Sequence, residues 1–231
     1  MIDFSPSPTV TDAVESRRSV RAFTDQPVDM AVLRDVLAKA QRAASGGNVQ
    51  PWEVTVLTGV PLKALCDDVT ARAMSGDPGG EEAFPFYPAD LPAPWKIQRA
   101  MVGHAMYEAL GIAREDKAGR AAAMLPNYRA FGAPVLLFVH CRKFMDRPQW
   151  ADMGIWLGTL MLPLREAGLA SSAQETFGRS AASIRRAIEV GDDAIIWTGL
   201  AIGWRDAAAP LNSFPVPRMD IDAVVQWKGF A

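Results

Sequence analysis

The amino-acid sequence predicts an α+β fold in which a modest sheet lies between layers of helices. Segments with helical periodicity alternate with short apolar segments typical of strands, and the helical segments are the more numerous. One long segment, residues 150–167, is apolar around most of its circumference, which indicates a central helix or one packed at a subunit seam. The chain has 231 residues, a length that suits one domain, so we expect residues 1–231 to form a single domain.

Helices are expected where apolar residues recur with a period near 3.6 residues. The clearest pattern lies in residues 28–43, where Val32 and Val36 share one face and charged residues occupy the other. Thr9 and Thr11 are both candidate N-caps of the first helix. The expected helices are residues 9–16, 28–43, 95–112, 118–125, 150–167 and 180–189.

Strands are expected where short apolar or β-branched runs lie between turn residues. Residues 53–58 alternate, with Val54 and Val56 on one side. Residues 134–140 and 194–202 are continuous apolar runs, which are typical of buried strands. The expected strands are residues 53–58, 134–140, 169–174 and 194–202.

Residues 75–94 are rich in glycine and proline, so no regular element is expected there. Long irregular loops in domains are usually lids or disordered segments. This one carries Phe84, Phe86 and Tyr87, which favours an ordered lid. We therefore treat residues 75–130 as a lid or insert region within the single domain.

The composition excludes several classes of protein. The formal net charge is −2, so no broad basic field directs the chain to nucleic acid or to anionic lipid. No apolar run is long enough to span a membrane, and the first residues lack the pattern of a secretory signal. Cys66 and Cys141 stand alone, which predicts neither a disulfide framework nor a zinc site. These features predict a cytoplasmic protein.

The usual catalytic and nucleotide-binding motifs are absent from the sequence. It contains no G-x-x-x-x-G-K-[ST], G-x-G-x-x-G, H-E-x-x-H, C-x-x-C or G-x-S-x-G. His104 and His140 are its two histidines, and we expect both to be partly buried structural residues and no metal to be bound. A chain of this size without such side chains suggests that a cofactor performs the chemistry.

Residues 17–21 form the motif R-R-S-x-R directly after the first expected helix. Arginine presents a planar fork of donors that matches phosphate oxygens, and a nearby hydroxyl can donate to the same anion. The motif therefore indicates an anion site. The alternative interpretation is a solvated basic turn.

A second candidate segment is A-S-G-G-N-V-Q-P-W at residues 44–52. Its glycines allow the backbone to approach a ligand closely, and Asn48 and Gln50 offer both donors and acceptors to the edge of a heteroaromatic ring. The alternative interpretation is a helix end followed by a turn into a strand.

Taken together, these motifs resemble those of the nitroreductase family of FMN enzymes. The resemblance continues in order along the chain, through R-E-A-G-L-A and residues 171–176 to I-G-W at 202–204 and P-R at 217–218. Elements between Tyr87 and Pro134 resemble one bacterial subgroup of the family. The resemblance implies an intertwined homodimer with a nitroreductase-like fold, built on a small, mainly antiparallel central sheet.

The resemblance also implies the residues that hold FMN. Arg17, Arg18 and Ser19 are expected to hold the phosphate together with Arg218, and Arg21 to reach the pyrimidine end of the flavin, where a cation stabilises developing negative charge. Gln174, Glu175 and Thr176 are expected near flavin N5. From the partner subunit, the resemblance implies contacts made by Ala44, Ser45, Gly46, Asn48 and Gln50.

Some positions depart from the family pattern. The family often has Pro-Ser-Ser where this chain has Ala44-Ser45-Gly46, and proline and glycine flanking the N5 contact where this chain has Ala173 and Thr176. Arg205-Asp206 replaces a common Pro-Asp. The departures leave the N5 contact and the role of Arg205 open.

The resemblance implies an oxidoreductase that passes a hydride from NAD(P)H through flavin N5 to nitroaromatic or related acceptors, with ping-pong kinetics and no catalytic protein side chain. Four aromatic side chains of the insert are candidate stacking surfaces for substrate, with plain packing as the alternative. They are Phe86, Tyr87, Trp95 and Tyr128. Other functions remain open: reductive dehalogenation, flavin fragmentation, or a non-catalytic flavin carrier or sensor.

Overall fold

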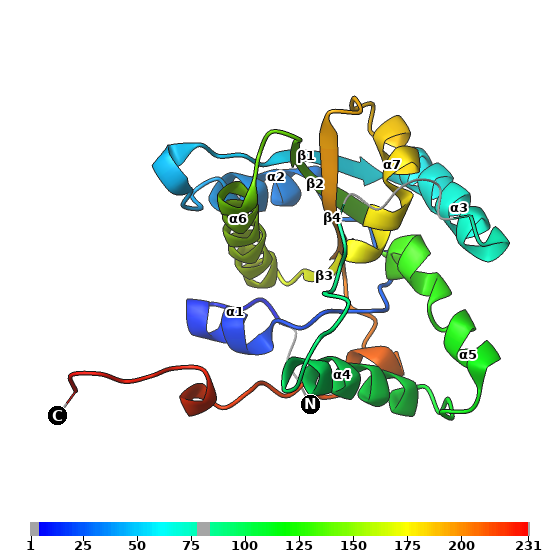
Figure 1. Ribbon diagram of the computed structural model, residues 1–231. Helices are drawn as coiled ribbons and strands as arrows, with labels where there is room; N and C mark the ends of the chain where they lie inside the picture. Colours follow the sequence, from blue (N-terminus) through cyan, green and yellow to red (C-terminus); the bar gives the residue numbers. More distant parts are fainter. Residues whose placement is uncertain (1–4, 78–83, 231) are drawn as a thin grey trace.

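The computed structural model describes residues 5–77 and 84–230, and its centre is a four-stranded antiparallel sheet in the order β1-β2-β4-β3 (Figure 1). The two inner strands are almost wholly buried, which explains why they are apolar without alternation. The expected small antiparallel sheet is confirmed, with ends within two residues of those expected. The strands are β1 (Glu53–Thr58), β2 (Val135–Arg142), β3 (Ala170–Gln174) and β4 (Ala194–Gly203).

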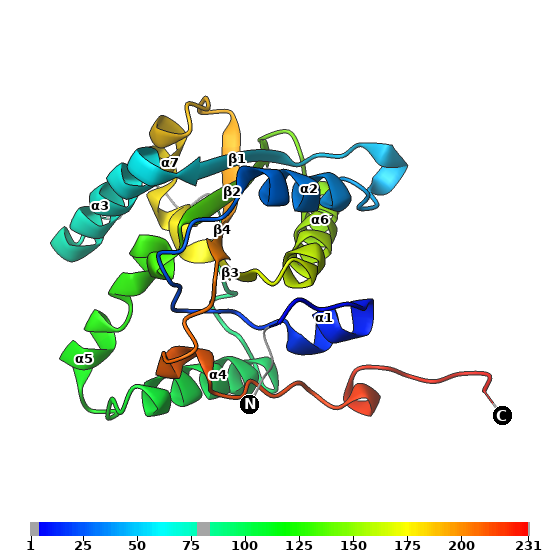
Figure 2. The same ribbon diagram turned by 180° about the vertical axis from the view of Figure 1, so that it is seen from behind.

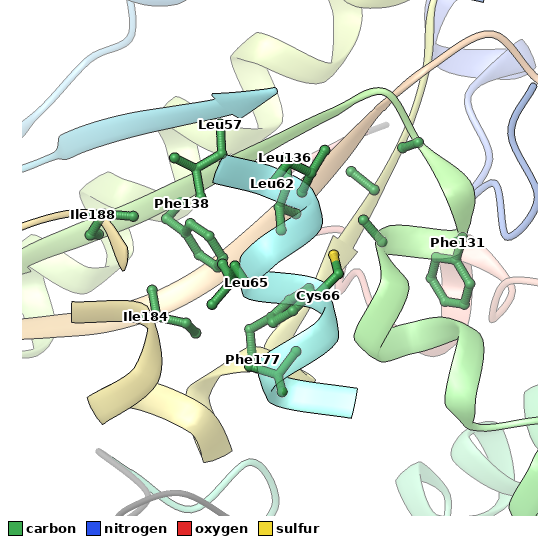
Figure 3. Close-up of a cluster of buried hydrophobic side chains, with 14 of the residues drawn as sticks. Leu57, Leu62, Leu65, Cys66, Phe131, Leu136, Phe138, Phe177, Ile184 and Ile188 are labelled. Atoms are coloured by element: carbon green, nitrogen blue, oxygen red, sulfur yellow. The ribbon is translucent and has the colours of Figure 1, made fainter. Parts of the chain in front are cut away.

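Helices cover both faces of the sheet, with α2 (Met30–Ala40) and α6 (Arg147–Glu166) on one side and α3 (Gly59–Ser75) and α7 (Ala181–Ala187) on the other (Figure 1). Alternate residues of β2 supply the two cores, because successive side chains of a strand point to opposite faces. Leu137 packs with α2 and α6, whereas Phe138 packs with α3 and α7. Figure 3 shows the core on the α3 and α7 side, with Phe138 in it.

Helix α3 is absent from the sequence expectations, which assigned no element to its residues. It begins with Gly59-Val60-Pro61, and no side chain caps its first turn. Its buried residues nevertheless follow helical spacing, from Leu62 and Leu65 to Val69. Proline is tolerated in a first turn, where the backbone N–H lacks an intrahelical partner in any case.

The expected helix boundaries shift where capping residues act. Thr9 caps α1 (Val10–Ser16), as expected. Asp146 and Gln149 form a capping box, so α6 begins three residues before the expected start. Gly111 takes a left-handed φ of 64°, and α4 (Trp95–Ala109) ends before it. The fifth helix, α5, is Lys117–Ala122.

Within the single chain, the helix expected at residues 150–167 is buried on one side, and the choice between a central position and a subunit seam stays open. Its sheet-facing side is buried, with Trp156 and Leu160 almost fully enclosed. On the other side Ile155 is 48% exposed, and Gly154 is exposed beside it. The histidines differ from expectation, because His140 is buried in β2 but His104 is exposed on α4.

Most of the insert and the end of the C-terminal tail lie outside the layered core, whereas Ala130 and Tyr128 at the end of the insert pack in or against it. Residues 84–94 are irregular, α4 and α5 lie away from the sheet, and the tail runs outward after Trp204 (Figure 2). Part of the expected lid, residues 78–83, is outside the described residues. No helix in the described part of the chain is both long and apolar enough to cross a membrane. The 3-10 helices are η1 (Gly46–Asn48), η2 (Leu125–Gly132), η3 (Glu175–Ser180), η4 (Pro210–Asn212) and η5 (Ile221–Ala223).

Candidate active site

The R-R-S-x-R segment runs from the end of α1 past the edge of the sheet. Ser19 forms a parallel bridge with Ser171 of β3, and the Val20 amide donates to the Ser171 carbonyl at 3.1 Å. Val20 and Phe23 are buried, whereas the arginines between and before them keep access to solvent. Two buried apolar residues therefore anchor the segment and leave its cations at the surface.

Four guanidinium groups gather around a cavity of about 290 Å³, which we call the cationic cavity. Arg18, Ser19, Arg21 and Arg218 line it, and Arg17 lies close enough to Arg218 for the two charges to interact. The side-chain hydrogen bonds of Arg18, Arg21 and Arg218 all go to backbone carbonyls. Within the described residues, no carboxylate forms an ion pair with any of the four arginines.

Burial lowers the pKa of two of these arginines, and like charge adds to the effect at one of them. Partial burial, followed by the nearby charges of Arg218 and Arg18, lowers the pKa of Arg17 from its ordinary value. Burial alone lowers the pKa of Arg21. Desolvated cations with like-charged neighbours favour the binding of an anion, because it would supply the missing opposite charge.

Asn212 in η4 is the functional residue that the sequence analysis missed. It is 7% exposed, and its Oδ1 accepts a hydrogen bond from the Arg21 amide at 2.8 Å. Its Nδ2 donates to the carbonyls of Ala22 and Asp206 at 2.8 and 2.9 Å. Asn212 therefore holds the R-R-S-x-R segment against the C-terminal part of the chain. No local motif marks it, because its partners are distant in sequence.

The turn from β3 into η3 carries the residues expected near flavin N5. Gln174 is 3% exposed, its Nε2 donates to the Asn127 carbonyl at 2.8 Å, and its Oε1 has no hydrogen-bond partner among the described residues. Burial raises the pKa of Glu175. β3 runs from Ser171 beside the cationic segment to Gln174, a distance of about 10 Å at strand spacing. β3 therefore links the cationic cavity to the buried Oε1 of Gln174, which accepts no hydrogen bond from the described residues.

The loop with Asn48 and Gln50 has a constrained conformation. Gly47, Asn48 and Gln50 all have left-handed φ angles, of 56°, 58° and 49°. Ser45 Oγ accepts from the Gln50 amide at 3.0 Å, and the Gly46 amide donates to both carboxylate oxygens of buried Asp152 at 3.2 Å. These bonds hold the loop in a fixed shape while its side chains stay largely in solvent.

This loop does not line the cationic cavity of its own chain. Its long-range contacts are with α6, and in both views η1 lies beside the outer end of α2, away from η4 and α4 (Figures 1 and 2). Within one chain, the structure therefore brings together Arg17, Arg18, Ser19, Arg21 and Arg218. It does not bring Ala44, Ser45, Gly46, Asn48 or Gln50 to them.

The four aromatic candidates do not form one stacking surface. Phe86 packs against Gly178 and under the Arg179 guanidinium, 5.2 Å from its ring centroid. Tyr128 borders a small cavity of about 180 Å³ that Arg179 also lines. Tyr87 instead lies under the Arg99 guanidinium at 3.9 Å, and Trp95 is 57% exposed at the start of α4. Phe86 and Tyr128 thus flank η3, and Tyr87 and Trp95 belong to the outer part of the insert.

Among residues 5–77 and 84–230, no group of three or more histidine, cysteine or acidic side chains is placed to hold a metal ion. The candidate site residues are instead mainly arginines, side-chain amides and aromatic rings. This set suits an organic anion rather than a metal centre.

The chain belongs to the nitroreductase family, whose model matches residues 14–204. It is 32% identical over 217 residues to the 4-nitrobenzoate reductase of Pseudomonas putida, with 94% of each chain covered. Among solved structures it is similar to the FMN and NADPH-dependent nitroreductase NfnB of Sphingopyxis sp. strain HMH. That likeness has 51% identity, a TM-score of 0.93, and coverage of 96% of this chain and 100% of the other.

A second solved relative is the FMN-dependent nitroreductase NfnB of Mycobacterium smegmatis, determined in complex with NADPH. It is 27% identical, with a TM-score of 0.89 and coverage of 94% of this chain and 97% of the other. The family and fold that the sequence predicts are confirmed, and both relatives are described as FMN-dependent, in agreement with the cofactor that the resemblance implies.

Proposed function

We propose that this chain is an FMN-dependent oxidoreductase that takes electrons from NAD(P)H and reduces nitroaromatic or related acceptors. The observation that carries the proposal is the cationic cavity, in which four arginines have no carboxylate partner in the described structure and which lies alongside β3. The names of relatives that align over almost the whole chain support the same reaction.

The residues of the site fit FMN. A phosphate would supply the counter-charge that Arg17, Arg18 and Arg218 lack, with the exposed hydroxyl of Ser19 beside them. The partnerless Oε1 of Gln174 is an acceptor suited to a ring N–H, and leaving such a group buried without a donor is costly. When bound, FMN supplies the hydride transfer for which the protein itself offers no group.

The remaining site residues orient and tune the cofactor. Arg21, held by Asn212, is a partly buried cation that would stabilise negative charge on the reduced ring if the pyrimidine end of the flavin lay beside it. Glu175 and Thr176 follow Gln174 at the start of η3, so their backbone lies at the end of β3 that the ring would reach. Phe86, Tyr87, Trp95 and Tyr128 are proposed to border the space for substrate. Donor and acceptor would use one space in turn, so we expect ping-pong kinetics.

We further propose that the active form is an intertwined homodimer. Ala44, Ser45, Gly46, Asn48 and Gln50 would then reach the cofactor of the partner chain. The loop of residues 44–50 and Ile155 on α6 support this arrangement, because each exposes surface to solvent in the described chain. The tail also carries large exposed apolar residues: Val224, Trp227 and Phe230.

We propose that residues 1–231 act as one domain in the cytoplasm. Both apolar cores lie on the two faces of one sheet, which supports a single folding unit. Cys66 and Cys141 are both free and buried, as is usual in a reducing compartment.

The visible spectrum of the purified protein, followed by anaerobic addition of NADPH, tests the proposal. A yellow protein that bleaches, and that recovers its colour when a nitroaromatic is added, is expected. A protein that bleaches but recovers only with another acceptor would point to a different reduction. A yellow protein that neither NADPH nor NADH bleaches would indicate a flavin carrier, and a colourless protein that takes up no FMN would overturn the whole proposal.

A further inference from the structure

A second and larger cavity lies in the insert, between the outer face of α4 and α5. Its volume is about 660 Å³, which is within the range of small-molecule sites. Four cationic side chains line it, together with His104, Tyr107 and a single carboxylate, Glu108. The cations are Lys96, Arg99, Arg114 and Arg120. We call this space the insert cavity.

Among the described residues, no carboxylate pairs with the cations of the insert cavity. Arg99 lies over the Tyr87 ring, and Arg120 lies 4.3 Å from the Tyr107 ring centroid and donates to the Arg114 carbonyl. No salt bridge in the described structure involves any of the four cations, and Glu108 pairs with none of them. The whole chain has a formal net charge of −2, so this local excess of positive charge does not follow from composition.

The helix geometry of α4 brings these groups to one face. Lys96, Arg99, Gly103 and Tyr107 follow at steps of three or four residues, which places them in one row. At Gly103 no atom lies within 4 Å of where a Cβ would stand, so the floor of the cavity is open between the charged side chains. An anionic ligand with an aromatic part would find both forked donors and a ring there.

The same helix separates the insert cavity from the cationic cavity. Val102 of α4 lines the cationic cavity, and its chain neighbour Gly103 lines the insert cavity. A helix with its side chains is about 10–12 Å across, so the two cavities are neighbours around one element. A long ligand with one end at the proposed flavin site has its other end close to the insert cavity.

We propose that the insert cavity binds the adenosine 2′-phosphate end of NADPH and so makes NADPH the preferred electron donor. This inference rests on the proposed function and names the donor for the same site. NADPH fits because it is long, carries an aromatic base and has one phosphate more than NADH. A nitroaromatic carboxylate has a single charge and would leave most of the four cations without a partner.

The test uses the FMN-loaded protein and the double variant K96Q/R114Q, which removes two exposed cations whose side chains form no hydrogen bond or ion pair in the described structure. The matched control is K143Q/R147Q, which removes the same charge from two exposed residues, one in the turn before α6 and one at its first position. We expect the KM for NADPH to rise about tenfold in K96Q/R114Q, the KM for NADH to change less than about twofold, and kcat to be retained. The control should match the wild type with both donors.

A binding measurement tests the cavity without turnover. Calorimetric titration with 2′,5′-ADP should show at least about tenfold tighter binding than with 5′-AMP in the wild type, and this difference should disappear in K96Q/R114Q. Equal changes in the KM for NADH and NADPH, or equal affinity for the two adenosine phosphates, would overturn the inference.

Two other outcomes separate this inference from its alternatives. A raised KM for 4-nitrobenzoate with an unchanged KM for NADPH would assign the cavity to the acceptor and overturn the inference. A protein that oxidises neither nucleotide would contradict the proposed function. The 2′,5′-ADP titration alone would then show whether the insert cavity binds an adenosine 2′-phosphate.

Discussion

The side chain of Asn212 accepts a hydrogen bond from the backbone amide of Arg21 at 2.8 Å, across 191 positions of sequence. Because Asn212 also donates to Ala22 and Asp206, it fixes the position of the cationic segment. Asn212 is therefore a positioning residue, and its loss should affect cofactor affinity and stability together.

Asn212→Leu should weaken FMN binding by about tenfold or more and lower the melting temperature of the protein. The substitution removes the printed partner of the Arg21 amide and of the Asp206 carbonyl, whereas the Ala22 carbonyl keeps its bond from the Asp206 amide. Each unsatisfied buried group costs about 1–3 kcal/mol. Fluorescence titration with FMN and thermal unfolding of the apoprotein measure the two effects. Ser213→Ala, at an exposed neighbour, is the control. An Asn212→Leu protein with unchanged FMN affinity would contradict the positioning role.

Arg17→Gln should weaken binding of FMN by about tenfold but leave the affinity for riboflavin within about twofold of wild type. The reason is that Arg17 is expected to contact only the phosphate, which riboflavin lacks. Dissociation constants for both flavins, with Arg147→Gln as a control outside the site, test this directly. An equal loss of affinity for the two flavins would place Arg17 at the ring or in the fold instead.

Gly178→Ala should alter acceptor reduction more than donor oxidation. An added Cβ would lie 3.0 and 3.2 Å from Cε1 and Cζ of Phe86, so the ring must move from its place beside η3. We expect a change in the KM for the nitroaromatic and little change in the rate of anaerobic reduction by NADPH. The double variant Gly178→Ala with Phe86→Leu should restore part of the loss, because the smaller side chain makes room. If the effects of the two single substitutions on the KM simply add in the double variant, the proposed contact between Gly178 and Phe86 is contradicted.

Ile155→Arg should convert the proposed homodimer to monomers and release FMN. An unpaired charge buried in an apolar interface costs several kcal/mol, and Ile155 is apolar and 48% exposed in the single chain. Light scattering coupled to gel filtration measures the mass. Met74→Arg, at an exposed apolar residue of α3, is the matched control. A dimer of unchanged mass in Ile155→Arg would place the interface elsewhere.

Acidification should destabilise the protein through His140. Burial lowers the pKa of this histidine below its ordinary value of 6.5, with a smaller opposing effect from Glu53. The unfolded chain then binds a proton before the native state does, so stability falls as the pH drops below about 6.5. Urea unfolding at about pH 7.5 and 5.5 should show a larger loss for wild type than for His140→Gln. His104→Gln, at an exposed imidazole, should behave as wild type.

Local patterns in the sequence were sufficient for the parts of the fold and site that local contacts determine. The R-R-S-x-R segment lies within five consecutive residues, β2 and β4 are marked by apolar runs, and β1 is marked by alternation. Helix α3 was missed because it begins with Gly-Val-Pro and has no side-chain cap, although the spacing of Leu62, Leu65 and Val69 was readable. The helix could have been predicted from this spacing alone, because its first residues give no capping signal.

Long-range pairings could not be predicted in the same way. The contact of Asn212 with Arg21 depends on the strand order β1-β2-β4-β3, which returns the chain to the R-R-S-x-R segment after β4. Likewise, the four candidate aromatics are all in the insert, but only the folded chain shows that Phe86 and Tyr128 flank η3 while Tyr87 and Trp95 do not. Residue type predicted their chemistry, and topology decided their neighbours.

The cationic cavity also has a consequence for the protein before any catalysis. In the described structure no carboxylate pairs with its four arginines, so an occupant that binds only the native state would add its binding free energy to folding. At a free concentration one hundred times its dissociation constant, such a ligand stabilises the native state by about 2.7 kcal/mol. Cells starved of riboflavin should therefore lose this protein to proteolysis, and vitamin supply would set its abundance as well as its activity.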